Sequence, residues 1–168
     1  GLIIVSATLL AVTVASAQER KGKVTNLPVP RFVSLKTSEG NVRRGPSLTH
    51  RIDWVFKRRS MPVRVTAEHG HWRRVQDRDG QGGWIHYSLL SGARTVLVER
   101  DMLTIHARPD SSSPVVAALQ VGVIARLGKC VAEYCQLRTG GFSGWAKKKR
   151  SCIVPPFCSR KRWKYIFV

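Results

Sequence analysis

Acidic residues are scarce in this sequence: 10 Asp and Glu stand against 29 Lys and Arg, which gives a formal net charge of +19. A charge of this size favours polyanionic partners such as nucleic acid, anionic lipid or anionic cell-wall polymer, without choosing among them. The alternative is a soluble protein from a lineage with a basic proteome. Proline and glycine make up only 22 of the 168 residues, which excludes a low-complexity chain, and five tryptophans favour folded cores.

A helical apolar period is also missing. Nothing between Phe32 and Ala146 sustains such a period over a dozen residues, which excludes a helical body. Short runs with period-two alternation are present instead, for example Pro62–Ala67 and Gly83–His86, and turn residues separate them. Alternation of this kind is typical of strands with one buried face. The sequence therefore predicts an all-β fold.

The common catalytic motifs are absent. The sequence has no H-E-x-x-H, no G-x-S-x-G and no Gly-rich phosphate loop. A Cys–His hydrolase needs a free, activated thiol, whereas Cys130 and Cys135 are expected to be structural. His69 and His71 flank Gly70 in a predicted hairpin turn, where exposure to solvent is the default and a metal role is the alternative. We predict no enzyme, no cofactor and no metal site.

The first 17 residues are uncharged and consist of apolar and small side chains. They end in Ala15-Ser16-Ala17, the small-x-small pattern that fits the narrow pockets of a signal peptidase. A membrane anchor or a buried strand is the alternative, but the run is short for a spanning helix, which needs about 20 apolar residues. We predict that residues 1–17 are a signal peptide, that the mature protein is periplasmic or otherwise exported, and that no transmembrane anchor remains after cleavage.

Two flanking segments differ in composition from the body of the chain. Residues 18–30 are polar and contain the extended stretch LPVP, so we expect a linker. Residues 152–168 are expected to form a basic, disordered tail, because the last 22 residues of the chain hold eight Lys or Arg and no acid. The alternative is a tail that binds phosphate backbones or anionic membrane through interleaved basic and aromatic residues.

The body of the chain contains one pattern twice. Three ordered blocks correspond to one another, at offsets of 63, 62 and 61 residues: Val42–Ser47 with Ile105–Asp110, His71–Val75 with Glu133–Leu137, and Gly83–His86 with Gly144–Lys147. A nearly constant offset over ordered blocks indicates two copies of one unit of about 55–60 residues. Short strands, frequent turns and no crossovers suit a small barrel.

The blocks NVRRGPS, HWRRV and GWIHYSLL of the first copy resemble the bacterial SH3-like domain. The surrounding PRFVSLK and LLSGARTVLV resemble exported, two-copy proteins of alphaproteobacterial type. The second copy departs from the pattern, because Arg108 stands at the place of Gly45 and Thr104 at the place of Asn41. The resemblance implies two tandem small SH3-like, partly open barrels, at residues 31–93 and 94–151. It also implies a targeting or ligand-binding role, often toward cell-wall peptides or glycans, and no catalysis.

Several motif residues are expected to be structural. Gly45 and Pro46 supply a tight loop, because Gly tolerates a positive φ and Pro fixes its own φ. Gly83 allows close backbone approach beside Trp84. The tryptophans Trp72 and Trp84 are expected in the core, with Trp145 as their structural counterpart in the second copy, whereas Trp54 is open to either face. The rest of the first core is predicted to be Val33, Leu35, Val42, Val63, Val65 and Val75.

Cys130 and Cys135 bracket the hairpin turn of the second copy. Cysteines on facing strands of a short hairpin approach the Cα separation of about 5.5 Å that a disulfide needs. We therefore predict a disulfide between them, which an exported protein permits. A zinc site built from all four cysteines is the rival, but four, sixteen and five intervening residues do not match the paired spacings that zinc favours.

The leading functional hypothesis is a non-catalytic exported protein that recognises cell-wall (peptidoglycan) peptide or glycan, or an envelope protein. Its contacts are expected at Arg43, Trp54 and Tyr87, near predicted loop and strand ends where grooves form. The alternative is a basic nucleic-acid-binding small-barrel protein, since small barrels and a charge of +19 suit polyanions. The signal segment counts against it. A scaffold that holds protein partners by strand addition or groove contacts is a third hypothesis.

Overall fold

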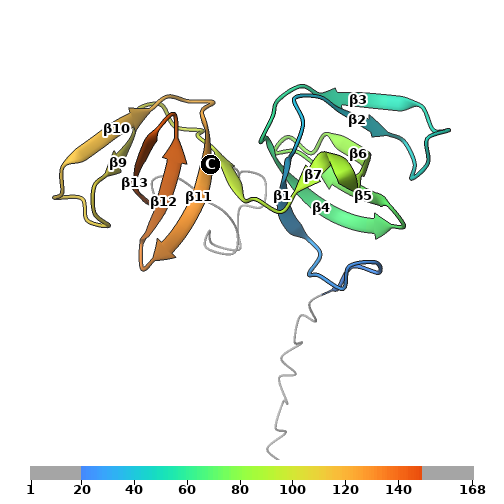
Figure 1. The fold of residues 1–168 in the computed structure, drawn as a ribbon, viewed down its shortest axis with the longest axis horizontal. Helices are drawn as coiled ribbons and strands as arrows, with labels where there is room; N and C mark the ends of the chain where they lie inside the picture. Colours follow the sequence, from blue (N-terminus) through green and yellow to red (C-terminus); the bar gives the residue numbers. More distant parts are fainter. Residues whose placement is uncertain (1–19, 149–168) are drawn as a thin grey trace, which may run out of the picture.

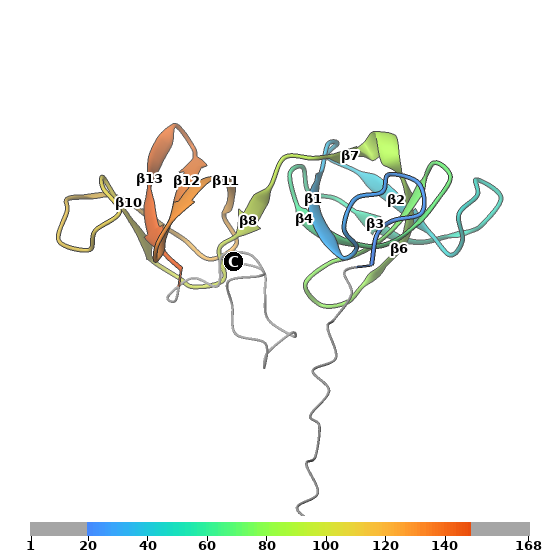
Figure 2. The same ribbon diagram turned by 90° about the horizontal axis from the view of Figure 1, so that it is seen from below.

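Two antiparallel sheets make up the described part of the molecule. The computed structural model describes residues 20–148, and Figures 1 and 2 show two lobes that are joined by the connection between β7 and β8. The strand orders are β3-β2-β6-β5-β4-β1-β7 in one sheet and β10-β9-β13-β12-β11-β8 in the other. We call them the first barrel and the second barrel. The predictions of an all-β fold and of two units are confirmed.

The first barrel consists of seven short strands and one 3-10 turn: β1 (Arg31–Leu35), β2 (Gly40–Arg43), β3 (Ile52–Phe56), β4 (Pro62–His69), β5 (Trp72–Gln76), β6 (Gly82–His86), η1 (Tyr87–Leu89) and β7 (Leu90–Ser91). The second barrel consists of six strands: β8 (Thr95–Leu97), β9 (Leu103–His106), β10 (Val115–Leu119), β11 (Ile124–Val131), β12 (Tyr134–Thr139) and β13 (Phe142–Lys147). Strands β1 and β8 begin close to the expected domain starts at 31 and 94, and the domain limits themselves stay predictions.

Some predicted features fall outside the described residues. These are the signal peptide at residues 1–17, the basic tail at residues 152–168, and the two cysteines within that tail, Cys152 and Cys158. Within residues 20–148 the structure contains no helix with the length and hydropathy that crossing a membrane requires.

The core of the first barrel is largely aliphatic and comes from alternate residues of its strands. Its buried members are Leu35, Val42, Phe56, Val63, Val65, Val75 and Ile85. Five of the six predicted residues are among them, and the sixth, Val33, packs against the cluster from a partly buried position. The prediction missed Phe56 and Ile85.

Trp72 and Trp84 do not lie in this core, and the expectation that they do is wrong. Ile85 is fully buried, whereas both indoles are only partly buried. Neighbouring residues in a strand point to opposite faces, so Trp84, which pairs with Arg74, lies on the outer face. The inner positions of β5 and β6 belong to Val75 and Ile85, whose compact side chains suit a small interior.

The second barrel buries its own aliphatic cluster: Val96, Val98, Leu103, Ile105, Leu119, Ala125, Leu127, Cys135, Leu137 and Ala146. Ala146 is fully buried and Trp145 only partly, so the same alternation holds as at Ile85 and Trp84. The predicted disulfide between Cys130 and Cys135 is confirmed. The two residues are register partners in β11 and β12, and their Cα atoms are 4.0 Å apart.

The two sheets repeat one register. Arg43 pairs with Trp84 in the first barrel, and His106 pairs with Trp145 in the second. Strands β4 and β11 each carry a register shift at the corresponding place. The two copies found in the sequence therefore fold into equivalent pairings, and a residue of one barrel has a definite counterpart in the other.

Residues 20–30, the described part of the predicted linker, are held against the first barrel. The carboxylate of Glu68 accepts hydrogen bonds from the backbone N–H of Val24 (3.0 Å) and of Thr25 (2.9 Å), and from the Thr25 hydroxyl (2.6 Å). Arg31 donates to the same carboxylate at 2.6 Å. The Glu68 side chain has no exposed surface, so this segment closes over a buried charge instead of leading freely into the barrel.

The two barrels contact each other directly. The Thr95 hydroxyl in β8 donates to the Ser60 carbonyl of the first barrel at 2.7 Å. The guanidinium of Arg58 donates to the carbonyl of Gly122 in the second barrel. Polar contacts from both sides therefore fix the junction between the barrels.

Candidate functional site

Four rings gather at one end of strands β5 and β6. We call His71, Trp72, His86 and Tyr87 the ring cluster. Trp72 and His86 are cross-strand partners, with ring centroids 5.6 Å apart and nearly perpendicular planes. Tyr87 lies 4.9 Å from His86 and 5.6 Å from His71, measured between centroids. The four rings therefore form one connected group, because every ring contacts at least one other.

Backbone bonds and a helix cap position the ring cluster. The N–H of Tyr87 donates to the carbonyl of His71 at 2.9 Å. His86 precedes the 3-10 turn η1, and its Nδ1 accepts from the N–H of Ser88. The rings are therefore set by the hairpin and the turn, both of which are short and hydrogen-bonded.

Arg73 supports the ring cluster from the inner side of the sheet. Its guanidinium carbon lies 6.0 Å from the centroid of the Tyr87 ring, within cation–π range. Its Nη1 donates to the carbonyls of Gly70 and Trp72, each at 2.8 Å, and its Nε is 3.5 Å from Glu68. Tyr87 nevertheless keeps 50% of its surface exposed, so it is both held in place and open to a ligand.

Glu68 stays ionised beneath this arrangement. Burial by itself would raise the pKa of this carboxyl group. Hydrogen bonds from Thr25, Arg31 and the backbone of Val24 outweigh burial and lower the pKa of Glu68 to about 2. The negative charge is therefore present under all ordinary conditions and balances Arg31 and Arg73.

Among the described residues, the second barrel has no ring cluster. The same hydrogen bond is present there, from the N–H of Lys148 to the carbonyl of Glu133, and Tyr134 pairs with Lys147 as Trp72 pairs with His86. The counterparts of His71, Trp72, His86 and Tyr87 are therefore Glu133, Tyr134, Lys147 and Lys148. Lys147 lies 3.4 Å from Glu133 in an ion pair. Only one aromatic ring remains, so the two barrels present different chemistry at equivalent places.

The three predicted contact residues lie in different surroundings. Tyr87 belongs to the ring cluster. Trp54 lies in β3 with 44% of its surface exposed. Arg43 closes the loop between β2 and β3 by donating to the carbonyls of Leu48 (3.0 Å) and His50 (2.6 Å). Among residues 20–148 no side-chain hydrogen bond or ring contact joins Arg43, Trp54 and Tyr87 to one another.

The family model for the bacterial SH3 domain matches residues 36–92 and 99–150. This chain belongs to the bacterial SH3 domain family. The two matches coincide with the two barrels, and the predicted family resemblance is confirmed. The family model describes an SH3 domain and includes no catalytic domain. No match to the chain is found among curated proteins.

Two solved structures are similar to the tandem SH3 domains, NlpC2 and NlpC1 from Trichomonas vaginalis. Each is 12% identical to the chain with a TM-score of 0.34. The match covers 71% of this chain and 46% of NlpC2, and 83% of this chain and 49% of NlpC1. The chain spans about half the length of these two proteins.

Two motif glycines of the first SH3 domain lie close to neighbouring atoms. A Cβ on Gly83 would lie 2.6 Å from the carbonyl oxygen of Arg43, which agrees with the predicted close backbone approach. A Cβ on Gly45 would lie 2.4 Å from the ring of His50. Gly45 is not among the residues with positive φ, so space beside His50, rather than a left-handed backbone, is what Gly45-Pro46 provides.

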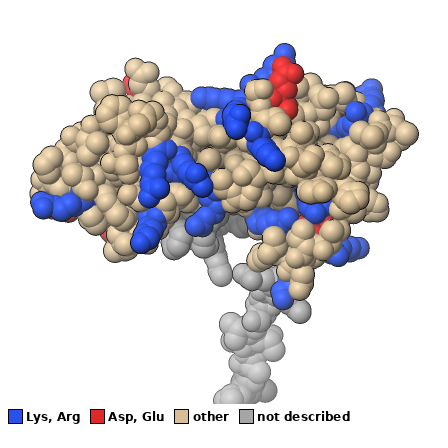
Figure 3. Space-filling view, in the orientation of Figure 1, with Lys and Arg blue, Asp and Glu red and all other residues tan. Residues whose placement is uncertain are grey.

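Basic side chains make up most of the charged surface of the SH3 domains that Figure 3 shows. In Figure 3 Lys and Arg greatly outnumber acidic residues, and several gather over the second domain and toward the junction. The acids that are present are largely engaged: Asp53 bonds Arg44 and Arg51, which hold its pKa below the usual range. Within residues 20–148 no group of three His, Cys, Asp or Glu side chains is placed to hold a metal ion.

The sequence carried a signal for the ring cluster that the prediction did not use. Each taken alone, His71 is expected in a turn and Trp72 in the core. A comparison of the two copies at the repeat offset shows the difference. The pairs His71-Trp72 and His86-Tyr87 of the first copy correspond to Glu133-Tyr134 and Lys147-Lys148 of the second. Residues that differ between two copies of one fold are candidates for function, since the shared residues already account for the fold.

Proposed function

We propose that this chain is an exported, non-catalytic binding protein whose first SH3 domain recognises a cell-wall peptide or glycan through the ring cluster. The observation that carries the proposal is the exposed Tyr87 within a set of four contacting rings that the second domain lacks. Rings that are already ordered lose little conformational entropy when they bind, which makes Tyr and Trp effective contact residues.

The chemistry of the ring cluster suits sugars and short peptides. The faces of Trp72 and Tyr87 offer apolar surface, while the imidazoles and the Tyr87 hydroxyl add hydrogen-bonding groups. Arg43 is a weaker contact candidate than expected, because its guanidinium already holds the β2–β3 loop. Trp54 remains a candidate second contact, since it is exposed on β3, which β2 separates from β6 in the same sheet.

Binding to isolated peptidoglycan tests the proposed ligand. The mature protein should sediment with peptidoglycan at physiological salt, and the double substitution His71→Ala/Tyr87→Ala should weaken binding by roughly tenfold or more, the loss expected for a pair of central ring contacts. The matched control is Glu133→Ala/Phe142→Ala, which removes the counterpart of His71 and an exposed ring in the second domain. Failure of the wild-type protein to sediment, or equal loss in both double variants, would refute the proposal.

Export is the second part of the proposal. It is supported by the apolar first 17 residues with their Ala-Ser-Ala end and by the disulfide between Cys130 and Cys135, which suits an oxidising compartment. Fractionation of cells that make the full-length protein should recover it in the periplasm, and N-terminal sequencing should begin at Gln18. An uncleaved cytoplasmic protein that ignores peptidoglycan would instead make nucleic acid the first partner to test, with a steep salt dependence expected from the charge of +19.

A further inference from the structure

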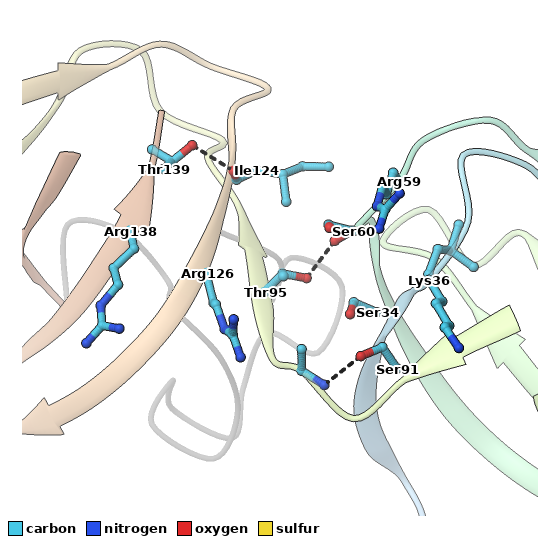
Figure 4. A pocket seen from close by; sticks show the side chains of 12 residues that line it. Ser34, Lys36, Arg59, Ser60, Ser91, Thr95, Ile124, Arg126, Arg138 and Thr139 are labelled. Atoms are coloured by element: carbon cyan, nitrogen blue, oxygen red, sulfur yellow. Dashed lines mark hydrogen bonds between the residues drawn. The ribbon is translucent and has the colours of Figure 1, made fainter. Parts of the chain in front are cut away.

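A pocket lies at the junction of the two SH3 domains. Its volume is about 310 Å³, and it is lined by Ser34, Leu35, Lys36, Arg59, Ser60, Ser91, Ala93, Thr95, Ile124, Arg126, Arg138 and Thr139. Figure 4 shows Arg126 and Arg138 on strands of the second domain and Arg59 and Lys36 on the first domain across the pocket. Both domains therefore supply cations to one cavity, and none of the lining residues is acidic.

The cations of this pocket are uncompensated. Arg126 and Arg138 are direct register partners in β11 and β12, and like charges in that position destabilise a sheet. In the part of the chain that the structure describes, no ion pair reaches Lys36, Arg59, Arg126 or Arg138. Arg138 donates only to the neutral amide of Gln136, at 3.2 Å. Four like charges around one cavity repel one another until an anion enters.

Hydroxyl groups line the floor of the pocket. Ser34 is only 2% exposed and lines the pocket from the first domain. The Ser91 hydroxyl accepts from the N–H of Ala93 at 3.2 Å, so its own proton is free for another acceptor. Serine hydroxyl groups at the wall of a cavity can donate hydrogen bonds to an anionic oxygen that enters it.

We infer that this pocket binds a phosphate group carried by a small ester or by a polymer. Guanidinium groups bind phosphate oxygens through paired, charge-assisted hydrogen bonds, and a tetrahedral dianion uses more donors than a planar monocarboxylate does. The volume exceeds that of a phosphate ion, which leaves room for an attached polyol or sugar. The inference does not rest on the ring cluster, because the two sites share no residue and each can fail alone.

Calorimetry with defined phosphate probes tests the inference. Pyrophosphate and glycerol 3-phosphate should bind the full chain, whereas glycerate, a monocarboxylate with a similar polyol group, should bind at least tenfold more weakly. The double substitution Arg59→Gln/Arg126→Gln should reduce affinity for both phosphate probes tenfold or more. The control Arg100→Gln/Arg108→Gln removes the same charge from exposed positions that do not line the pocket, and should reduce affinity less than twofold.

Polyphosphate identifies the source of the phosphate group. Tighter binding of polyphosphate, per phosphate, than of glycerol 3-phosphate indicates a polymer, and weaker binding indicates a small ester.

Two further readouts keep the result decisive. In a ¹H–¹⁵N spectrum, pyrophosphate should shift the backbone amides of Ser34, Ser91 and Thr95 selectively. Pyrophosphate should also raise the unfolding midpoint of the wild-type protein but not that of Arg59→Gln/Arg126→Gln. Shifts spread evenly over the basic surface, equal losses in the two double variants, or glycerate binding as tight as glycerol 3-phosphate would each overturn the inference.

Discussion

Replacing Ile85 with alanine should destabilise the first SH3 domain by about 3–4 kcal/mol, the cost of deleting a fully buried aliphatic side chain and leaving a cavity. Ile85 has 0% exposed surface and belongs to the core cluster of that domain. Replacing the adjacent Trp84 should cost only about 1–2 kcal/mol although its side chain is much larger, because a half-buried ring on the outer face loses less apolar contact. Urea unfolding by circular dichroism, with hydrogen exchange to separate the two domains, measures both values.

Comparing Ile85→Ala with Trp84→Ala tests directly which of the two side chains faces the core. If Trp84 were the core residue, its substitution would be the more damaging of the two. Ile85→Val serves as the conservative control and should cost about 1 kcal/mol. Hydrogen exchange in the second domain should stay unchanged in all three variants, since each domain has its own buried cluster.

Replacing Glu68 with glutamine should destabilise the first SH3 domain by about 3 kcal/mol. The substitution keeps the shape but leaves Arg31 and Arg73 without their buried counter-charge, which is the costly way to break an ion pair. Arg31 Nη1 already lacks a hydrogen-bond partner within residues 20–148. The loop that contains Thr25 should also detach, so trypsin should cut at Lys21 and Lys23 faster than in the wild-type protein.

The same carboxylate predicts a pH dependence. The pKa of Glu68 is lowered from 4.5 to about 2 in the folded protein, so folding favours the ionised form. Its contribution is complete above pH 4.5 and is lost as the pH falls from there through about 2. The pKa difference converts to at most about 3 kcal/mol.

The difference in unfolding free energy between wild-type and Glu68→Gln protein should therefore shrink steadily below pH 4.5. Glu39→Gln is the matched control, because it removes one exposed carboxylate and should change neither stability nor the pH profile. A difference that stays constant between pH 7 and pH 3 would show that Glu68 is not held ionised by its partners.

Much of the fold follows from local sequence pattern. Period-two alternation and turn residues determine that the chain forms short strands, because a strand with one buried face must alternate. The repeat offset determines that there are two copies, and the residues bracketing the second hairpin place Cys130 opposite Cys135. Val42, Val65 and Val75 were predictable for the same reason, because their neighbours in each strand are polar.

The face of the sheet on which Trp84 lies was not predictable from the sequence. Trp84 and Ile85 are adjacent and both apolar, so hydrophobicity alone does not say which one faces inward. The pairing of β6 with β2 and β5 decides it by placing Trp84 opposite Arg43 and Arg74. The local context of Arg43 likewise does not show that its guanidinium closes a loop.

The sequence by itself determined the composition of this protein's parts: two basic β-units of one family, one hairpin disulfide, and no common catalytic motif. Only the tertiary structure decided what those parts bring together. The ring cluster unites residues from the two ends of a hairpin, the residues around Glu68 join the N-terminal loop to β4, and the cationic pocket needs side chains that are about 100 residues apart, Lys36 and Arg138. The physical reason is that alternation and turns act over a few residues, whereas contacts between strands and between domains depend on register and docking, which no short stretch of sequence encodes.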